Sequence, residues 1–210
     1  VNIFRLLKMI ISCSRRTDIP AFYSKWLIKR LREGFCYVPN PFNPKQISEV
    51  PLTPDKVEVI VFWTKNVINL LPYIKELDKM RYKYYFLYTL NGYDNVFEPY
   101  LPVFDQRIEA FKELSKKIGK EKVIWRYDPI ILSNITPLEF HIENFKTISN
   151  ALSGFTDRCI LSIVSIYKRI RKHLELLREN NIEVDFEPRT NNSLRELIGN
   201  IVETANQKNI

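Results

Sequence analysis

The chain has 210 residues, 45% of them hydrophobic, and carries a formal net charge of +8. This apolar content excludes a disordered chain, and the length is enough for one large domain or two small ones. The positive charge favours anionic partners, although acidic residues are interleaved with the basic ones along the chain.

The cysteines exclude two common kinds of site. Cys13, Cys36 and Cys159 are far apart in the sequence and form no CxxC pair, so neither a zinc site nor a disulfide framework is recognisable. Three isolated thiols fit a reducing, cytoplasmic location. No stretch approaches the length of a membrane span, so we expect no membrane partner.

Apolar runs alternate with helix signals in the first half of the chain. The expected elements, in order, are a strand at 9–13, a helix with Phe22, Trp26, Leu27 and Leu31 on one face that ends at Gly34, an extended piece at 35–38, a rigid proline-rich loop at 39–44, a strand at 57–63, a helix with Ile68, Leu71, Ile74 and Leu77 inward, and a strand at 84–90.

The second half continues the alternation. The expected elements are a helix capped by Asp105 and ended by Gly119, a strand at 123–127 stopped by Asp128-Pro129, a helix opened by a capping box at 136–139, a strand at 159–164, a basic helix at 167–179 and a final helix opened by a capping box at 193–196. Alternation at 182–186 fits either a strand or a loop. By helical phase, His141 and His173 are expected on the surface.

Repeated strand–helix units predict an α/β protein with a parallel sheet. With only five glycines, the chain has no Gly-rich dinucleotide turn, so a partial (β/α) TIM-like barrel with about five parallel strands is favoured. We expect a single barrel domain over residues 1–210, incomplete at its C-terminus.

In parallel α/β folds, functional residues sit where strands end. After the first strand, Asp18 is the expected helix N-cap, and the turn before it offers guanidinium groups and backbone N–H groups to an anion. The candidate ligand-binding residues at the strand ends are Ser14, Arg15, Arg16, Asp18, Trp63, Lys65, Asn66, Arg126, Tyr127 and Asp128.

Each of these candidates also has a purely structural interpretation. Asp18 could act only as a cap, Lys65 could be a surface lysine, and Arg126 could simply pair with Asp128. No Ser–His–Asp set, carboxylate pair or metal quartet is recognisable from spacing, so the sequence assigns no catalytic residue and no metal ligand.

Four motifs resemble the family called domain of unknown function 1848. They are 12–23 (SCSRRTDIPAFY), 40–44 (NPFNP), 61–66 (VFWTKN) and 123–129 (VIWRYDP), and the resemblance runs from about Met9 to Tyr167. Members of this family resemble radical S-adenosylmethionine (SAM) enzymes, with a cysteine cluster near the C-terminus that is similar to a three-cysteine iron–sulfur motif.

The resemblance implies a 4Fe-4S cluster and S-adenosylmethionine in full-length relatives. No cysteine follows Cys159 here, so we expect no cofactor in this chain, a missing C-terminal segment, and an N-terminal barrel that is inactive alone. The expected partner is a small anionic substrate or cofactor. The alternative is a basic nucleic-acid-binding module without catalysis, which phosphate contacts would make strongly salt-dependent.

Overall fold

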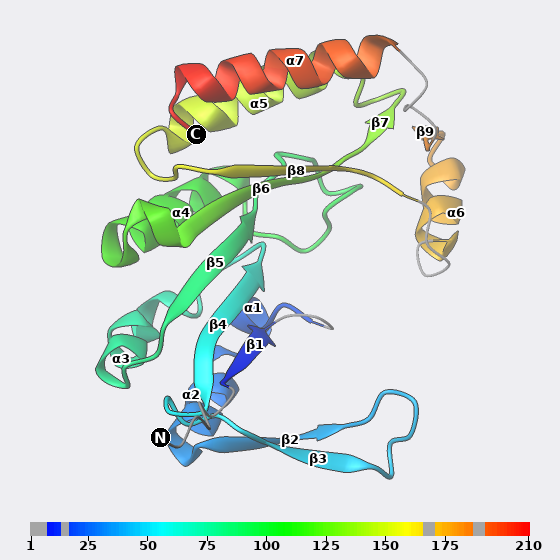
Figure 1. Ribbon diagram of the computed structural model, residues 1–210. Helices are drawn as coiled ribbons and strands as arrows, with labels where there is room; N and C mark the ends of the chain where they lie inside the picture. The colour runs from blue at the N-terminus through cyan, green and yellow to red at the C-terminus, as the bar shows by residue number, and fades with distance from the viewer. Residues whose placement is uncertain (1–7, 14–16, 166–170, 187–191) are drawn as a thin grey trace, which may run out of the picture. The chain divides into compact units, whose positions relative to one another are not determined.

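A computed structural model describes residues 8–13, 17–165, 171–186 and 192–210 of the chain, without the side chains of 171–173 and 192–193. The chain divides into two compact units, Val1–Tyr88 and Thr89–Ile210, which are described separately. Both units combine helices with parallel strand pairs (Figure 1), which confirms the predicted α/β class.

The first unit contains a three-stranded parallel sheet in the order β1-β4-β5. Its elements are β1 (Met9–Cys13), α1 (Ile19–Phe22), α2 (Ser24–Glu33), β2 (Phe35–Pro39), β3 (Ile47–Pro51), β4 (Val57–Thr64), the 3-10 turn η1 (Leu71–Tyr73), α3 (Ile74–Lys79) and β5 (Tyr84–Thr89). Cys13 pairs with Phe62 of β4, and Phe62 pairs with Phe86 of β5, so the three strands lie in register near their carboxyl ends.

The first predicted helix is two helices, because the chain breaks at Tyr23. Leu27 and Leu31 are buried as predicted, but Phe22 and Trp26 are exposed, which corrects the predicted apolar face. Gly34 ends α2 in the left-handed conformation with φ 82° and donates its N–H to Arg30 O, as a glycine C-cap does. Ile68, predicted to lie on the inner face of the next helix, precedes η1 and is exposed. Leu71, Ile74 and Leu77 are buried as predicted.

The predicted proline-rich loop is the tip of a β-hairpin. β2 and β3 pair antiparallel from Phe35 opposite Pro51 to Pro39 opposite Ile47, and Figure 1 shows this hairpin extending away from the sheet of the first unit. The extended piece at 35–38 was predicted, but β3 was not. The β3 sequence ISEVP does not alternate between apolar and polar residues, and four of its five residues are exposed, so it lacks the pattern that predicts a half-buried strand.

The second unit contains two parallel strands, β6 and β8, with helices packed beside them. Its elements are α4 (Phe104–Ile118), the 3-10 turn η2 (Lys120–Lys122), β6 (Val123–Ile130), β7 (Leu132–Ser133), α5 (Leu138–Leu152), β8 (Cys159–Ile163), α6 (Arg171–Glu179), β9 (Val184–Asp185) and α7 (Asn192–Gln207). α5 and α7 lie side by side (Figure 1), and β7 pairs antiparallel with β9.

The core of the second unit forms where β6 meets α5. Trp125 stacks on Phe145 with ring centroids 4.7 Å apart, and Tyr127 meets the same ring edge-on at 5.3 Å. Successive strand side chains point to opposite faces. Arg126 and Asp128 therefore lie on the face of β6 opposite to α5.

Several predicted boundaries in the second unit are wrong for local reasons. β6 does not stop at Asp128-Pro129 but continues to Ile130. The N-cap of α4 is Val103, so Asp105 lies inside the first turn. Thr136 is not a capping residue, because its hydroxyl donates to Ile131 O at 2.6 Å and Pro137 holds the cap position. The 182–186 segment contains the short strand β9.

The predicted strand content is confirmed, whereas the barrel stays a prediction. Parallel pairing joins three strands in the first unit and two in the second. Within the described residues, the sheet of neither unit closes on itself. Among the same residues, no helix has both the length and the apolar character needed to cross a membrane.

Candidate functional site: two strand-end clusters

Asp18 ties the start of α1 to the end of β4. Its Oδ1 accepts the N–H of Ala21 at 3.0 Å, as predicted for an N-cap, and the hydroxyl of Thr64 at 2.8 Å. Its Oδ2 accepts the backbone N–H of Lys65 at 2.7 Å. Burial raises the pKa of the Asp18 carboxyl, and the hydrogen bonds from Lys65, Ala21 and Thr64 oppose that rise.

The neighbouring candidates of the first unit lie at the same strand end. Lys65 and Asn66 are half-buried directly after β4, and Asn66 receives Ile68 N–H at 3.1 Å in an Asx turn. Trp63 is half-buried within β4. Ser14, Arg15 and Arg16 fall outside the described residues. Asp18, Lys65 and Asn66 are therefore brought together around the Thr64 hydroxyl.

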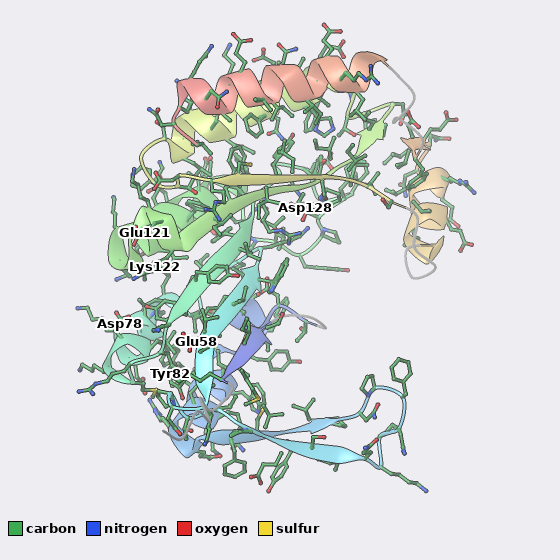
Figure 2. The ribbon with its side chains drawn as sticks, viewed as in Figure 1. Glu58, Asp78, Tyr82, Glu121, Lys122 and Asp128 are labelled. Carbon is green, nitrogen blue, oxygen red and sulfur yellow. The ribbon has the colours of Figure 1, made fainter. Side chains whose placement is uncertain are left out.

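A second cluster forms near the carboxyl end of β6, where Asp128 is labelled in Figure 2. The Asp128 carboxylate forms an ion pair with Arg126 and accepts the hydroxyl of Ser162 from β8. The Arg126 and Asp128 side chains are 22% and 11% exposed, so the pair is partly shielded but still reachable from solvent. Burial lowers the pKa of the Arg126 guanidinium group.

A buried polar frame fixes the backbone of Asp128. The Asn91 side chain accepts Asp128 N–H at 2.8 Å and donates to Asp128 O at 3.1 Å. The same Asn91 amide donates to Glu98 at 3.1 Å, and Glu98 forms an ion pair with Arg107 whose two side chains are each 3% exposed. Mutual pairing makes such a burial tolerable, since an isolated buried charge is very costly.

Tyr127 and His141 form a second buried network beside this frame. His141 is fully buried, which corrects its predicted surface position. Its Nε2 lies 2.9 Å from Ile131 O, a carbonyl that can only accept, so Nε2 carries the proton. Nδ1 must then accept the hydroxyl of Tyr127 at 2.8 Å, while Asn144 donates to the same hydroxyl oxygen at 3.0 Å.

Glu98 and Arg107 were not predicted as site residues from the sequence, although the position of Arg107 carries a detectable signal. Arg107 precedes Phe111, Leu114 and Ile118 at helical spacing, so it occupies the buried stripe of α4. A charge at such a position indicates a buried partner. Glu98 lies outside the helices and strands, where no periodicity marks it.

The two clusters belong to different units of the chain. Asp18, Lys65 and Asn66 gather in the first, and Arg126 gathers with Asp128 in the second. From the parallel strand–helix pattern we predict that the strand-end candidates converge around one concavity, and this stays a prediction. Tyr127 is fully buried against Phe145, so its ring serves packing.

The described residues contain no group of three or more His, Cys, Asp or Glu side chains placed to hold a metal ion. Burial raises the pKa of Cys13 to about 12, with Cys36 adding to the rise, and burial also raises the pKa of Cys159 to about 12. A cluster ligand must be a thiolate, but a bound metal ion itself deprotonates a coordinating thiol, so the expected absence of a cofactor from this chain stays a prediction.

The comparison with protein families decides the affiliation. A family model described as "Domain of unknown function (DUF1848)" matches residues 10–210, which is nearly the whole chain. The chain belongs to the DUF1848 family. No curated protein and no solved structure matches it. The resemblance to DUF1848 seen in the four motifs is thus confirmed, and the clusters described above contain three of these motifs in part.

Proposed function

We propose that this DUF1848 protein binds a small anionic ligand, a carboxylate or a phosphate, at the carboxyl ends of its parallel strands. One observation carries the proposal. Arg126, Asp128 and Ser162 form a partly exposed charged cluster on the face of β6 opposite to the core helix α5. Strand ends of parallel α/β sheets are the usual place for ligands in this class of fold.

The chemistry of the cluster suits an anion. A guanidinium group offers a planar fork of N–H donors that matches the oxygens of a carboxylate or phosphate. Asp128 occupies that fork through its ion pair with Arg126. An incoming anion presents the same oxygen geometry and competes for Arg126, while Asp128 keeps the hydroxyl of Ser162.

The rigid frame around Asp128 supports a binding role. Asn91 holds both the N–H and the carbonyl of Asp128, and the buried pair of Glu98 and Arg107 holds Asn91 in turn. Prearranged polar groups bind more tightly because little conformational entropy is lost on binding. We extend the proposal to Arg15, Arg16 and Lys65 of the first unit as further anion partners, on sequence grounds.

Iron–sulfur and S-adenosylmethionine chemistry is not part of this proposal. The relation of DUF1848 to radical SAM enzymes stays a prediction from resemblance, and so does the absence of a cluster from this chain. Nucleic-acid binding stays the alternative, based on the net charge of +8.

The proposal is tested by titrating the protein with phosphate and with malonate while recording the arginine Nε–H signals by NMR. We expect a saturable shift of the Arg126 signal and of the Ser162 amide. Arg126→Met should abolish the response. Lys120→Met removes the same charge from the turn before β6, where Lys120 pairs with Asp157 at 2.7 Å, and should leave the response intact.

Two results would contradict the proposal. One is an equal loss of the response in both variants, which would mean that only net charge matters. The other is tight binding of single-stranded DNA with an affinity that falls steeply as salt rises, which is the behaviour of a phosphate-tracking module.

A further inference from the structure

A pocket of about 760 Å³ lies in the first unit, between the start of α2 and the segment that leads into η1, and its lining residues do not include Asp18, Lys65 or Asn66. Its walls are held in place by short hydrogen bonds. Asn69 donates to Ala21 O at 2.5 Å, which joins the two walls, and Ser24 donates to Pro20 O at 2.6 Å. The volume falls within the range of small-molecule sites, roughly 300–1,000 Å³.

Aromatic rings line this pocket and are exposed. Phe22, Tyr23 and Trp26 are 68%, 50% and 45% exposed, and Tyr73 completes the wall. Among the described residues, none of these four rings stacks on another ring. In the cores of the two units, by contrast, rings pair closely. Exposed rings gathered at one place mark a binding surface, and their faces are available for stacking on a planar ligand.

The charge of the pocket selects the kind of planar ligand. Lys25 is its one charged lining residue among those described, and no carboxylate lines it. A cationic ring would therefore be repelled, whereas an anionic substituent would be attracted. Asn69 adds a side-chain carbonyl and a second amide hydrogen, the pair of groups with which asparagine pairs with the edge of a base.

We infer that this pocket binds a mononucleotide-sized ligand, a planar base that carries a phosphate. The base stacks on the rings of Trp26 and Tyr23, and Lys25 pairs with the phosphate. Base stacking on aromatic side chains with a cation on the phosphate is the usual chemistry of nucleotide capture without a Gly-rich loop. This site is independent of the Arg126 cluster, so either proposal can fail alone.

The test is calorimetric titration of the full chain with adenosine monophosphate (AMP), adenosine and inorganic phosphate. AMP should bind saturably and quench tryptophan fluorescence, because Trp26 is much more exposed than the fully buried Trp125. Adenosine should bind about tenfold more weakly, since it lacks the charge-assisted contact. Inorganic phosphate should give the same titration curve with the wild type and with Lys25→Met.

Matched variants separate the two contacts. Trp26→Leu should weaken AMP binding at least about tenfold, in line with the loss of one stacking partner. Lys25→Met should lower AMP affinity to that of adenosine and leave adenosine binding unchanged. Lys29→Met removes the same charge from a neighbouring exposed turn of α2, where Lys29 pairs with Glu33, and should have no effect. Lys25, Trp26 and Lys29 are exposed, so their replacement should leave the fold intact. A cooperative thermal transition in each variant should confirm this.

Three results of the AMP and adenosine titrations would overturn the inference. They are equal affinities for AMP and adenosine, equal effects of the Lys25 and Lys29 variants, and AMP binding that survives Trp26→Leu in folded protein. A single-stranded oligonucleotide that binds far more tightly than AMP, with steep salt dependence, would also overturn it and assign the pocket to nucleic acid.

Discussion

His141 should make the stability of the chain depend on pH in a range where few other groups titrate. Burial lowers the pKa of His141 from its ordinary value of 6.5. A base with a lower pKa in the folded chain binds protons more readily when the chain unfolds, so acid favours unfolding. The stabilising contribution is complete above about pH 6.5 and is lost as the pH falls to the pKa of the folded chain.

The magnitude follows from the hydrogen bonds of the imidazole ring. Nδ1 accepts the Tyr127 hydroxyl and Nε2 donates to Ile131 O, so protonation places a second N–H donor against the Tyr127 hydroxyl proton. We expect the free energy of unfolding to fall by up to about 1.4 kcal/mol per pH unit between pH 6.5 and the lowered pKa. Carboxylates contribute mainly below about pH 5.

The assay is urea unfolding at half-unit steps between pH 7.5 and 5, followed by circular dichroism. His141→Gln keeps a donor for Ile131 O and should flatten the curve between pH 7 and 5.5. Ser149→Ala, which removes a buried hydroxyl from the same helix, should shift the curve and keep its slope. Equal slopes in the wild type and His141→Gln would refute the reasoning.

Three further predictions follow from other contacts. Arg107→Met leaves Glu98 as a buried charge without its cation and should cost about 3–5 kcal/mol in urea unfolding, whereas Lys112→Met, which breaks a pair with an exposed glutamate, should cost at most about 1 kcal/mol. Similar losses in both would contradict the buried-pair argument. Asp18→Ala should destabilise the first unit by about 2–3 kcal/mol, because one carboxylate accepts bonds from Ala21, Thr64 and Lys65, and Thr64→Val should cost less; a neutral result by hydrogen exchange would be evidence against this role. Cys13 should react slowly with iodoacetamide in the folded chain, because its thiol is buried and burial raises its pKa. Anaerobic reconstitution should leave no stoichiometric iron on the chain. Stoichiometric iron that is lost on Cys13→Ser would contradict the expected absence of a cluster.

The sequence predicted the parallel strands well because each is a dense apolar run. β4 and β5 are buried on both faces, so tertiary packing reinforces the signal that their valine and aromatic residues already carry. The strand-end rule also singled out Asp18, Lys65 and Asp128, for which the structure gives hydrogen bonds or an ion pair, while a binding role for them stays a prediction.

The sequence failed where side-chain hydrogen bonds replace periodicity. Thr136 belongs to a predicted capping box, yet its hydroxyl is satisfied by Ile131 O, a carbonyl that no sequence pattern points to. His141 was predicted on the surface by helical phase, but it is buried because the Tyr127 hydroxyl of β6 bonds its ring. Phe22 and Trp26 were predicted to lie in the core, but in α1 and α2 both side chains are exposed.

The hydrogen bonds of the Asp18 carboxylate make ligand binding at this strand end detectable by amide hydrogen exchange. Cys13 is paired to β4, and Asp18 is bonded to the end of the same strand, so only four residues separate two fixed points. Any ligand that displaced the Asp18 carboxylate would have to release the amides of Ala21 and Lys65 at the same time. Exchange of those two amide hydrogens would then quicken on binding, so binding could be detected by hydrogen exchange without knowing the ligand.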